Sequence, residues 1–506
     1  MEGLIPKYEG TRQLLNQHHE KAVIFRHSHI AITDYHMGDN REFEKSLSRW
    51  DKMRWKYELL GGYYVKALKE FRVNRAFNVE QLKRFFPEYE FKVENCAYPY
   101  DEFDVVLTTP PRDDLQRVTL TFMASEGKFK NNAKFTQQMI ELGTGKGKTM
   151  MGTAISTFFK SNVLVIVPLA KLLNQWKESF ITFTNVDEDD ILIVKGSKIC
   201  NQILEGKHRD KHVFIFMVDT IYSFNKTYGD IKTMDMLSAT RCHTKIVDEI
   251  HLDLKAISMI EAMCNIKMSY YLSASAGRTE SKENWIFKNL FTHIPRFGSN
   301  IETQEEKHLN VMVKKYYFTP TPKQIKRMVN NKTGLNTKAY ETELRLSPED
   351  QRLNFEQQLT VILNWTKKNL KEGNKIIVFG QSIEFLYYLQ TIVEKVYPDR
   401  TSVYYGGMKK DEKEKALLSD IIIATTASLG TGADIKGLQF GINCSTYSSW
   451  ISVKQISGRL RKLPDGTPTV YIEMVNFGYL KTVRQFEKRK PHLTKASRTG
   501  KLLMVN

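Results

Sequence analysis

The chain has 506 residues, enough for about three domains of typical size, and carries 75 basic against 57 acidic residues. Its formal charge of +18 favours a polyanionic partner, although a merely soluble basic surface would give the same sum. Five scattered cysteines without a C-x-x-C pair argue against a disulfide framework and a zinc site. No signal peptide or long apolar run is present, so we expect a cytoplasmic protein with no membrane partner.

Residues 1–108 lack the strand–helix alternation of the rest of the chain and end near a Pro-Pro dipeptide, which predicts a small N-terminal α+β module. Within it, aromatic and basic residues interleave. Trp50, Trp55 and Tyr57 have the character of a surface that stacks nucleobases while neighbouring cations contact phosphates. Aromatic residues at helical spacing are more often core residues, and both interpretations stay open.

The remainder of the chain predicts two α/β domains, because short apolar runs alternate with helix-like stretches in two series. The expected strands of the first series are 162–167, 212–218, 245–248 and 269–273. Those of the second are 375–379, 402–405, 420–425, 441–445 and 470–475. Turn residues in the polar stretch 300–351 indicate a linker or an insertion. We therefore divide the chain into a module of 1–108, domains at 109–305 and 306–483, and a basic C-terminal tail at 484–506.

A glycine-rich segment, Leu142-Gly-Thr-Gly-Lys-Gly-Lys-Thr149, is typical of a phosphate-binding loop. Its glycines let backbone amides turn inward around phosphates, while the last lysine supplies charge and the threonine hydroxyl a magnesium ligand. The strict pattern has glycine where this chain has Leu142. The expected nucleotide-binding residues are Gly143, Thr144, Gly145, Lys146, Gly147, Lys148 and Thr149.

Two further segments supply catalytic groups. Val247-Asp-Glu-Ile-His251 follows a short apolar strand, so that Asp248 can hold Mg²⁺ and Glu249 can polarise the attacking water. Gln455-Ile-Ser-Gly-Arg-Leu-Arg461 offers two cations late in the chain, as an arginine finger supplied in cis requires.

In this order the three segments resemble the superfamily 2 helicases and translocases. The resemblance implies two tandem RecA-like P-loop NTPase domains with parallel sheets and ATP bound between them. It covers about residues 110–480. The DEIH sequence and the segment from Val165 to Trp176 are most similar to the phage UvsW-type and RecG-like group rather than to the DEAD-box RNA helicases. For a phage protein, the compartment would be the host cytoplasm.

The resemblance also assigns individual residues. Gln116 corresponds to the upstream glutamine that reads adenine, and His251 to the histidine that couples the nucleotide to motif III, here Leu272–Ala276. Gly432 and Asp434 of motif V correspond to further nucleotide contacts. The track contacts that it implies are Pro168, Lys171, Thr220, Gln381 and Thr425.

Motif VI departs from the family pattern, Q-x-x-G-R-x-x-R. Gln455 and Arg459 match it and are expected to be catalytic, with Arg459 as the first finger. The final arginine of the pattern would fall on Lys462, and Arg461 lies one position earlier. An arginine stabilises spread negative charge better than a lysine, so Arg461 is the candidate for the second finger, and position 462 stays open.

The sequence therefore predicts an ATP- and Mg²⁺-dependent DNA helicase or translocase that unwinds or branch-migrates recombination and replication intermediates. Its expected partner is single-stranded, forked or junction DNA, and RNA stays open. One alternative is a translocase that releases transcripts or remodels nucleoprotein complexes without net unwinding. Another is a nucleic-acid-binding or annealing protein with a degenerate ATPase core, against which intact Lys148, Asp248, Glu249 and Arg459 argue.

Overall fold

The structure is a computed structural model of the chain. It describes residues 20–505 except 95–96, 126–135, 144, 274–280, 299–307, 331–333, 430–434 and 448–458. The chain divides into two compact units, Met1–Glu302 and Thr303–Asn506. In the described part of the chain, no helix is long and apolar enough to cross a membrane.

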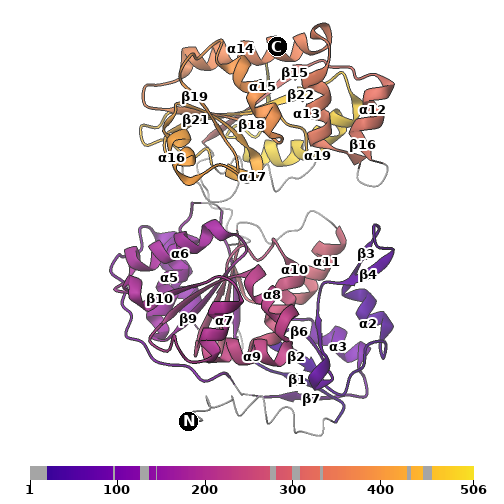
Figure 1. Cartoon of the computed structure of the whole chain (residues 1–506), viewed down its shortest axis with the longest axis vertical. Helices are drawn as coiled ribbons and strands as arrows, with labels where there is room; N and C mark the ends of the chain where they lie inside the picture. The colour runs from indigo at the N-terminus through magenta and orange to yellow at the C-terminus, as the bar shows by residue number, and fades with distance from the viewer. Residues whose placement is uncertain are drawn as a thin grey trace. The chain divides into compact units, whose positions relative to one another are not determined.

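The first unit contains a seven-stranded parallel sheet (Figure 1). Its order is β10 (Ile191–Val194), β11 (Val213–Met217), β9 (Val163–Val167), β12 (Thr244–Val247), β13 (Met268–Ser273), β8 (Gln137–Glu141) and β14 (Arg296–Phe297). Four of these strands, β9, β11, β12 and β13, lie at the predicted runs. The apolar pattern did not reveal β8, because this strand begins with two glutamines, which are nevertheless buried.

Helices cover both faces of this sheet and enclose two apolar cores. They are α4 (Asp114–Ala124), α5 (Lys148–Phe159), α6 (Ala170–Phe183), α7 (Ser197–Leu204), α8 (Val218–Tyr228), α9 (Asp230–Ala239), α10 (Leu254–Met263) and α11 (Ser281–Leu290). Successive strand residues point to opposite faces. In β9, Val165 therefore joins the core that contains Trp176 of α6, whereas Leu164 and Ile166 join the core that contains α8 and α10.

The N-terminal module has a five-stranded sheet of its own. Its order is β5 (Tyr63–Val65), β6 (Glu70–Asn74), β2 (His29–Ile32), β1 (Ala22–Phe25) and β7 (Glu90–Val93). The other elements are α2 (Arg41–Ser46), α3 (Val79–Phe85) and a hairpin of β3 (Ser48–Asp51) and β4 (Lys56–Leu59). The apolar core of the module is continuous with the α8–α10 side of the large sheet. The module is therefore packed onto the first α/β domain.

A buried charge network reinforces this packing. Glu70 accepts hydrogen bonds from Arg26 Nη2 (3.1 Å) and Arg72 Nε (2.7 Å), and Arg72 Nη1 donates to the carbonyl of Ala262 at the end of α10 (2.7 Å). Burial favours the neutral form of Glu70, but Arg72 and Arg26 outweigh it and lower the pKa of Glu70 to about 2. Arg26 has a second partner in Glu94 (2.6 Å), whereas Arg72 pairs with Glu70, so the contact of Arg72 with α10 is sensitive to the loss of Glu70.

The second unit repeats the architecture with another seven-stranded parallel sheet. Its order is β19 (Thr401–Tyr404), β20 (Ile421–Thr425), β18 (Lys375–Gly380), β21 (Leu438–Asn443), β22 (Thr469–Asn476), β15 (Leu309–Tyr316) and β23 (Leu503–Val505). Its helices are α12 (Pro322–Met328), α13 (Thr337–Leu346), α14 (Glu349–Asn369), α15 (Ile383–Val393), α16 (Lys410–Leu418), α17 (Thr426–Leu429) and α19 (Leu480–Ala496). Tandem α/β domains with parallel sheets, preceded by a small module, are thus confirmed.

Two segments of the second unit differ from expectation. The polar stretch 300–351 is not a linker where it is described: Leu309–Tyr316 forms β15, whose alternate residues are buried within the sheet. Residues 484–505, expected to form a basic tail, lie mostly in α19 and β23. Arg489 is buried there. It can be buried because the buried carboxylate of Glu473 pairs with it and compensates its charge.

Candidate nucleotide and nucleic-acid sites

The glycine-rich loop connects β8 to α5 at the carboxyl edge of the first sheet. Gly145 (φ 83°) and Gly147 (φ 82°) have left-handed backbones, which glycine adopts without strain. Lys148 Nζ donates to the carbonyls of Leu142 (2.8 Å) and Gly143 (3.1 Å), so the loop curls around the ammonium group. The amides at the start of α5 have no helical acceptors, and such a helix terminus favours phosphate.

Gln116 lies against this loop although it is distant in sequence. Its side chain is buried on α4, accepts from the amide of Arg112 (2.8 Å) and donates to the carbonyl of Lys146 (3.5 Å). A Cβ added at Gly147 would come within 2.2 Å of Gln116 Nε2. The glycine therefore makes room for the glutamine, and the structure places the expected adenine-reading residue beside the expected phosphate loop.

Asp248 and Glu249 follow β12 at the same edge of the sheet, since β8, β13 and β12 are parallel neighbours. Asp248 is buried and accepts hydrogen bonds from Trp176 Nε1 (3.0 Å) and from the amide of Glu249 (2.9 Å). Burial, together with the charge of Glu249, raises the pKa of Asp248 to about 6, while Trp176 and Lys148 act in the opposite direction. Lys148 is thus within electrostatic reach of Asp248.

The donor atoms at this edge fit a magnesium–nucleotide complex. The carboxylate of Asp248 and the hydroxyl of Thr149, in the first turn of α5, are the hard oxygen ligands that Mg²⁺ prefers. Burial disfavours the ionised form of this carboxylate, and a neighbouring cation would stabilise that form. Among the described residues, no group of three metal-ligating side chains gathers, so the ion would also need phosphate and water oxygens.

Glu249 has an unusual backbone, with φ at +45°, a conformation that strains residues other than glycine and is common at functional sites. Its Oε2 lies 3.3 Å from His251 Nδ1. The same nitrogen lies 3.0 Å from Ser273 Oγ at the end of β13. His251 therefore connects the expected water-polarising carboxylate to the first hydroxyl of the expected motif III. Residues 274–276 of that motif lie outside the described residues.

The expected track contacts also gather at strand ends. In the first unit, Pro168 follows β9, Lys171 lies in the first turn of α6, and Thr220 lies in the first turn of α8. In the second unit, Gln381 follows β18 and Thr425 ends the adjacent β20. Each set lies at the carboxyl edge of its own sheet, where α/β folds commonly bind ligands.

Sequence reasoning missed Glu341, a buried carboxylate on α13 that fixes the backbone around Gln381. It accepts from the amides of Gln381 (2.9 Å) and Ser382 (2.8 Å) and from Ser382 Oγ (2.9 Å). Burial raises the pKa of Glu341 to about 7. Trp176 was also missed as a partner of Asp248. Neither role has a local sequence signal, because each depends on a contact between distant segments.

Motif VI is described only in part. Arg459 is half-buried and Arg461 exposed in the second unit, and the amide of Arg461 donates to the carbonyl of Arg459 (3.0 Å). The choice between Arg461 and Lys462 stays a prediction. Four expected site residues lie outside the described residues: Thr144, Gly432, Asp434 and Gln455.

Two family models match the chain. Residues 112–276 match "Type III restriction enzyme, res subunit", and residues 355–463 match "Helicase conserved C-terminal domain". The first match contains the phosphate loop and the DEIH segment, and the second contains Arg459 and Arg461. Each expected catalytic segment with described residues therefore lies within a matched domain.

Curated relatives are similar over most of the chain. A protein of Acanthamoeba polyphaga mimivirus, named as an ATP-dependent RNA helicase, is 24% identical over 73% of this chain and 64% of its own length. A transcript termination protein of Yaba-like disease virus is 24% identical over 70% of each chain. A DNA 3'-5' translocase of Sulfurisphaera tokodaii is 22% identical over 80% of this chain and 90% of its own. The helicase domain of Pyrococcus furiosus Hef aligns with a TM-score of 0.45 at 15% identity, covering 74% of this chain and 97% of that one.

The chain belongs to the superfamily 2 helicases and translocases, a class of ATP-dependent enzymes. The finer resemblance to UvsW-type and RecG-like proteins stays a hypothesis.

Proposed function

We propose that this protein is an ATP-dependent translocase that moves along DNA and acts on branched or partly single-stranded substrates. The observation that carries the proposal is the position of His251, whose Nδ1 lies 3.3 Å from the carboxylate of Glu249 and forms a hydrogen bond with Ser273 Oγ (3.0 Å). These residues lie beside the phosphate loop, at the sheet edge where the expected track contacts of the first unit also lie. Binding or hydrolysis of ATP could therefore shift the residues that contact the nucleic acid.

The residues divide the chemistry among them. Lys148 and the amides of the loop bind the phosphates, and Gln116 contacts the base. Glu249 orients the attacking water and accepts its proton. Asp248 and Thr149 would hold Mg²⁺, which when bound would offset the phosphate charge. In the second unit, Arg459 supplies a guanidinium group for the charge that develops in the transition state, and Arg461 is our candidate for the second finger.

Movement follows from alternating grip. ATP binding closes the motor and hydrolysis opens it again. Domain motions of this kind take microseconds to milliseconds. Pro168, Lys171, Thr220, Gln381 and Thr425 would contact the backbone of the strand rather than base edges, because a motor must release and regrip at any sequence.

A second candidate is favoured by the names of the relatives. A transcript termination protein and a DNA 3'-5' translocase are both similar to this chain. Either name suits a translocase that removes transcripts or proteins from DNA without net unwinding. The mimivirus relative is named as an RNA helicase, so the test also includes RNA as a substrate.

One substrate panel tests these proposals. ATP hydrolysis and strand separation are measured with single-stranded DNA, blunt duplex, fork, four-way junction, a stalled transcription complex and RNA. We expect DNA to stimulate hydrolysis, and forks or junctions to be separated. Hydrolysis without separation, accompanied by transcript release, would favour the second candidate. Hydrolysis that no nucleic acid stimulates would contradict both.

A further inference from the structure

The β3–β4 hairpin presents three large aromatic side chains that the fold does not bury. Trp50, Trp55 and Tyr57 are 41%, 74% and 48% exposed. The Trp50 ring makes edge contacts with Trp55 (centroids 6.4 Å apart) and Tyr57 (5.0 Å). The interpretation of these residues as core is therefore wrong. A contiguous exposed aromatic cluster usually marks an interaction site.

The backbone of the hairpin turn adds a second observation. Asp51 Oδ1 accepts from the amides of Met53 (2.8 Å) and Arg54 (3.2 Å), which tightens the turn. Trp55 then closes it with φ at +51°, where glycine or asparagine would be less strained. Because most of the Trp55 side chain is exposed, burial does not offset this strain. The indole is held outward by a backbone that is costly for it.

The surroundings of the cluster are basic. Lys45 Nζ lies 5.4 Å from the centre of the Tyr57 ring. Asp51 is the acidic residue of the turn, and Arg54 pairs with it at 3.6 Å. Besides Lys45, the hairpin itself carries the exposed cations Lys52, Arg54 and Lys56. Aromatic faces among cations fit unpaired nucleobases, which stack on the rings while their phosphates contact the charges.

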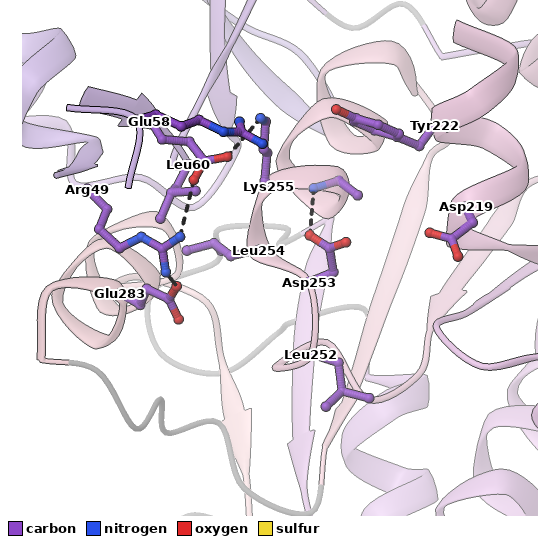
Figure 2. Close-up of a pocket in the computed structure, with 12 residues that line it drawn as sticks. Arg49, Glu58, Leu60, Asp219, Tyr222, Leu252, Asp253, Leu254, Lys255 and Glu283 are labelled. Carbon is purple, nitrogen blue, oxygen red and sulfur yellow. Dashed lines mark hydrogen bonds and ion pairs between the residues drawn. The ribbon is translucent and has the colours of Figure 1, made fainter. Parts of the chain in front are cut away.

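The base of the hairpin is anchored to the first α/β domain beside a groove of about 410 Å³ (Figure 2). Arg49 pairs with Glu283 of α11 and with Glu58 (3.2 Å), and Glu58 accepts from Lys255 Nζ of α10 (2.9 Å). These ion pairs fix the hairpin on the helices that carry it.

The groove reaches from the hairpin to helix α8. Besides Arg54 of the hairpin turn, Asp219 and Tyr222 of α8 line it. Thr220, an expected track contact, lies between these two residues in the sequence. Thr220 itself is buried and does not line the groove, so a strand at the first turn of α8 would meet the groove at Asp219 and Tyr222.

We propose that the β3–β4 hairpin stacks on the unpaired bases of single-stranded DNA, next to the strand contacts of the first α/β domain. Trp55 makes the outermost stack, Trp50 and Tyr57 support it, and the surrounding cations hold the phosphates. Bases held in this way cannot re-pair while they stay stacked. This inference rests on the proposed function, because it assumes a DNA track at Thr220.

The test uses full-length protein and three fluorescein-labelled substrates: a fork with single-stranded DNA arms, the same fork with RNA arms, and a blunt DNA duplex without arms. We expect Trp55→Ala to weaken fork binding about 5-fold or more, the lower end of one base–aromatic stack, and duplex binding less than about 2-fold. Trp55→Phe should retain fork binding, whereas Trp55→Leu should not, since leucine is apolar without a π-face. Phe158→Ala is the matched control, because Phe158 is an exposed aromatic residue at the far end of α5.

Three outcomes would overturn the inference: fork binding unchanged in Trp55→Ala, equal losses on fork and blunt duplex, or a loss seen only with RNA arms. A wild-type dimer that dissociates in Trp55→Ala, with fork binding unchanged, would assign the surface to a second copy. DNA-stimulated hydrolysis by the wild type tests the motor separately. If the wild type fails there, the proposed function is wrong; if only the hairpin variants behave as wild type in fork binding, the inference alone is wrong.

Discussion

Adjacent residues at the end of β12 have different environments. Asp248 is buried beneath the indole of Trp176, whereas Glu249 is only half-buried and is aimed by a left-handed backbone toward His251. A buried carboxylate suits a metal ligand that holds its position. A partly exposed one suits a base that must reach a water molecule.

This division predicts different losses for two variants. Lys148→Ala should weaken ATP binding about 10-fold or more, because hydrogen bonds to charged groups contribute about 1.5–3 kcal/mol. Glu249→Gln should bind ATP normally and hydrolyse it about 100-fold more slowly or worse, the usual size of a lost general base. Fluorescent-nucleotide binding and phosphate release with DNA measure the two effects. The control is Lys160→Ala, at the other end of α5, which should behave as the wild type. Hydrolysis at the wild-type rate by Glu249→Gln would refute the assignment of Glu249 as the general base.

Single substitutions can also show which residues of motif VI act as arginine fingers. Fingers contribute about 10³-fold or more to turnover, so Arg459→Lys should lose more than about 10-fold, since an ammonium cannot reproduce a bidentate contact. ATP affinity should change little. A comparable loss in Arg461→Lys would place the second finger there, and a small one would return the role to Lys462 or to neither. Turnover at saturating ATP and DNA is the measurement; an Arg459→Lys enzyme within about threefold of wild type would end the assignment.

At the scale of elements, Arg72 of β6 contacts α10 through the carbonyl of Ala262, and Glu70 of β6 balances the charge of Arg72. Glu70→Gln leaves Arg72 buried without its carboxylate partner and leaves Arg26 with Glu94, and we expect a loss of about 3–5 kcal/mol in the free energy of unfolding at pH 7. Because the folded pKa of Glu70 is lowered to about 2, its contribution is complete above the unfolded value near 4.5 and is lost as the pH falls toward 2. The wild type and the variant should therefore converge in acid.

Urea unfolding between pH 7 and pH 3 measures the difference in unfolding free energy between the wild type and Glu70→Gln. His29 in the same network has a lowered pKa, mainly through burial, and adds acid sensitivity to both proteins alike. Glu80→Gln on α3 is the control, because its pair with Lys83 is exposed and such pairs contribute about 0–1 kcal/mol. A pH-independent difference between wild type and Glu70→Gln would contradict the network.

At the scale of the whole molecule, each unit has its own parallel sheet and its own cores. We expect residues 1–302 and 303–506 to fold as separate fragments, each with a cooperative thermal transition. The first fragment should bind ATP, since the phosphate loop and Asp248 lie in it. It should hydrolyse ATP about 10³-fold more slowly than the full chain, because Arg459 is absent. A first fragment with full turnover would show that the second unit supplies no finger.

A cut within the first unit should behave differently. Residues of the N-terminal module share an apolar core with α8 and α10, so removing the module would expose buried side chains of both helices. We expect the truncated chain to be much less stable than the whole unit. The boundary at residue 108, and the recognition role of the module, stay predictions.

The sequence by itself determined the class of protein and the chemistry at the end of two strands. The glycines and Lys148 of the loop, and the DEIH segment after an apolar run, act through local backbone geometry and near neighbours, which short patterns record. Only the tertiary structure decided what lies across from them. It placed Gln116 against Gly147, Trp176 on Asp248 and Glu341 behind Gln381; it also buried Arg489 and left Trp55 exposed. Burial and pairing depend on which distant segments pack together, and the same residue types occur in cores and on surfaces alike.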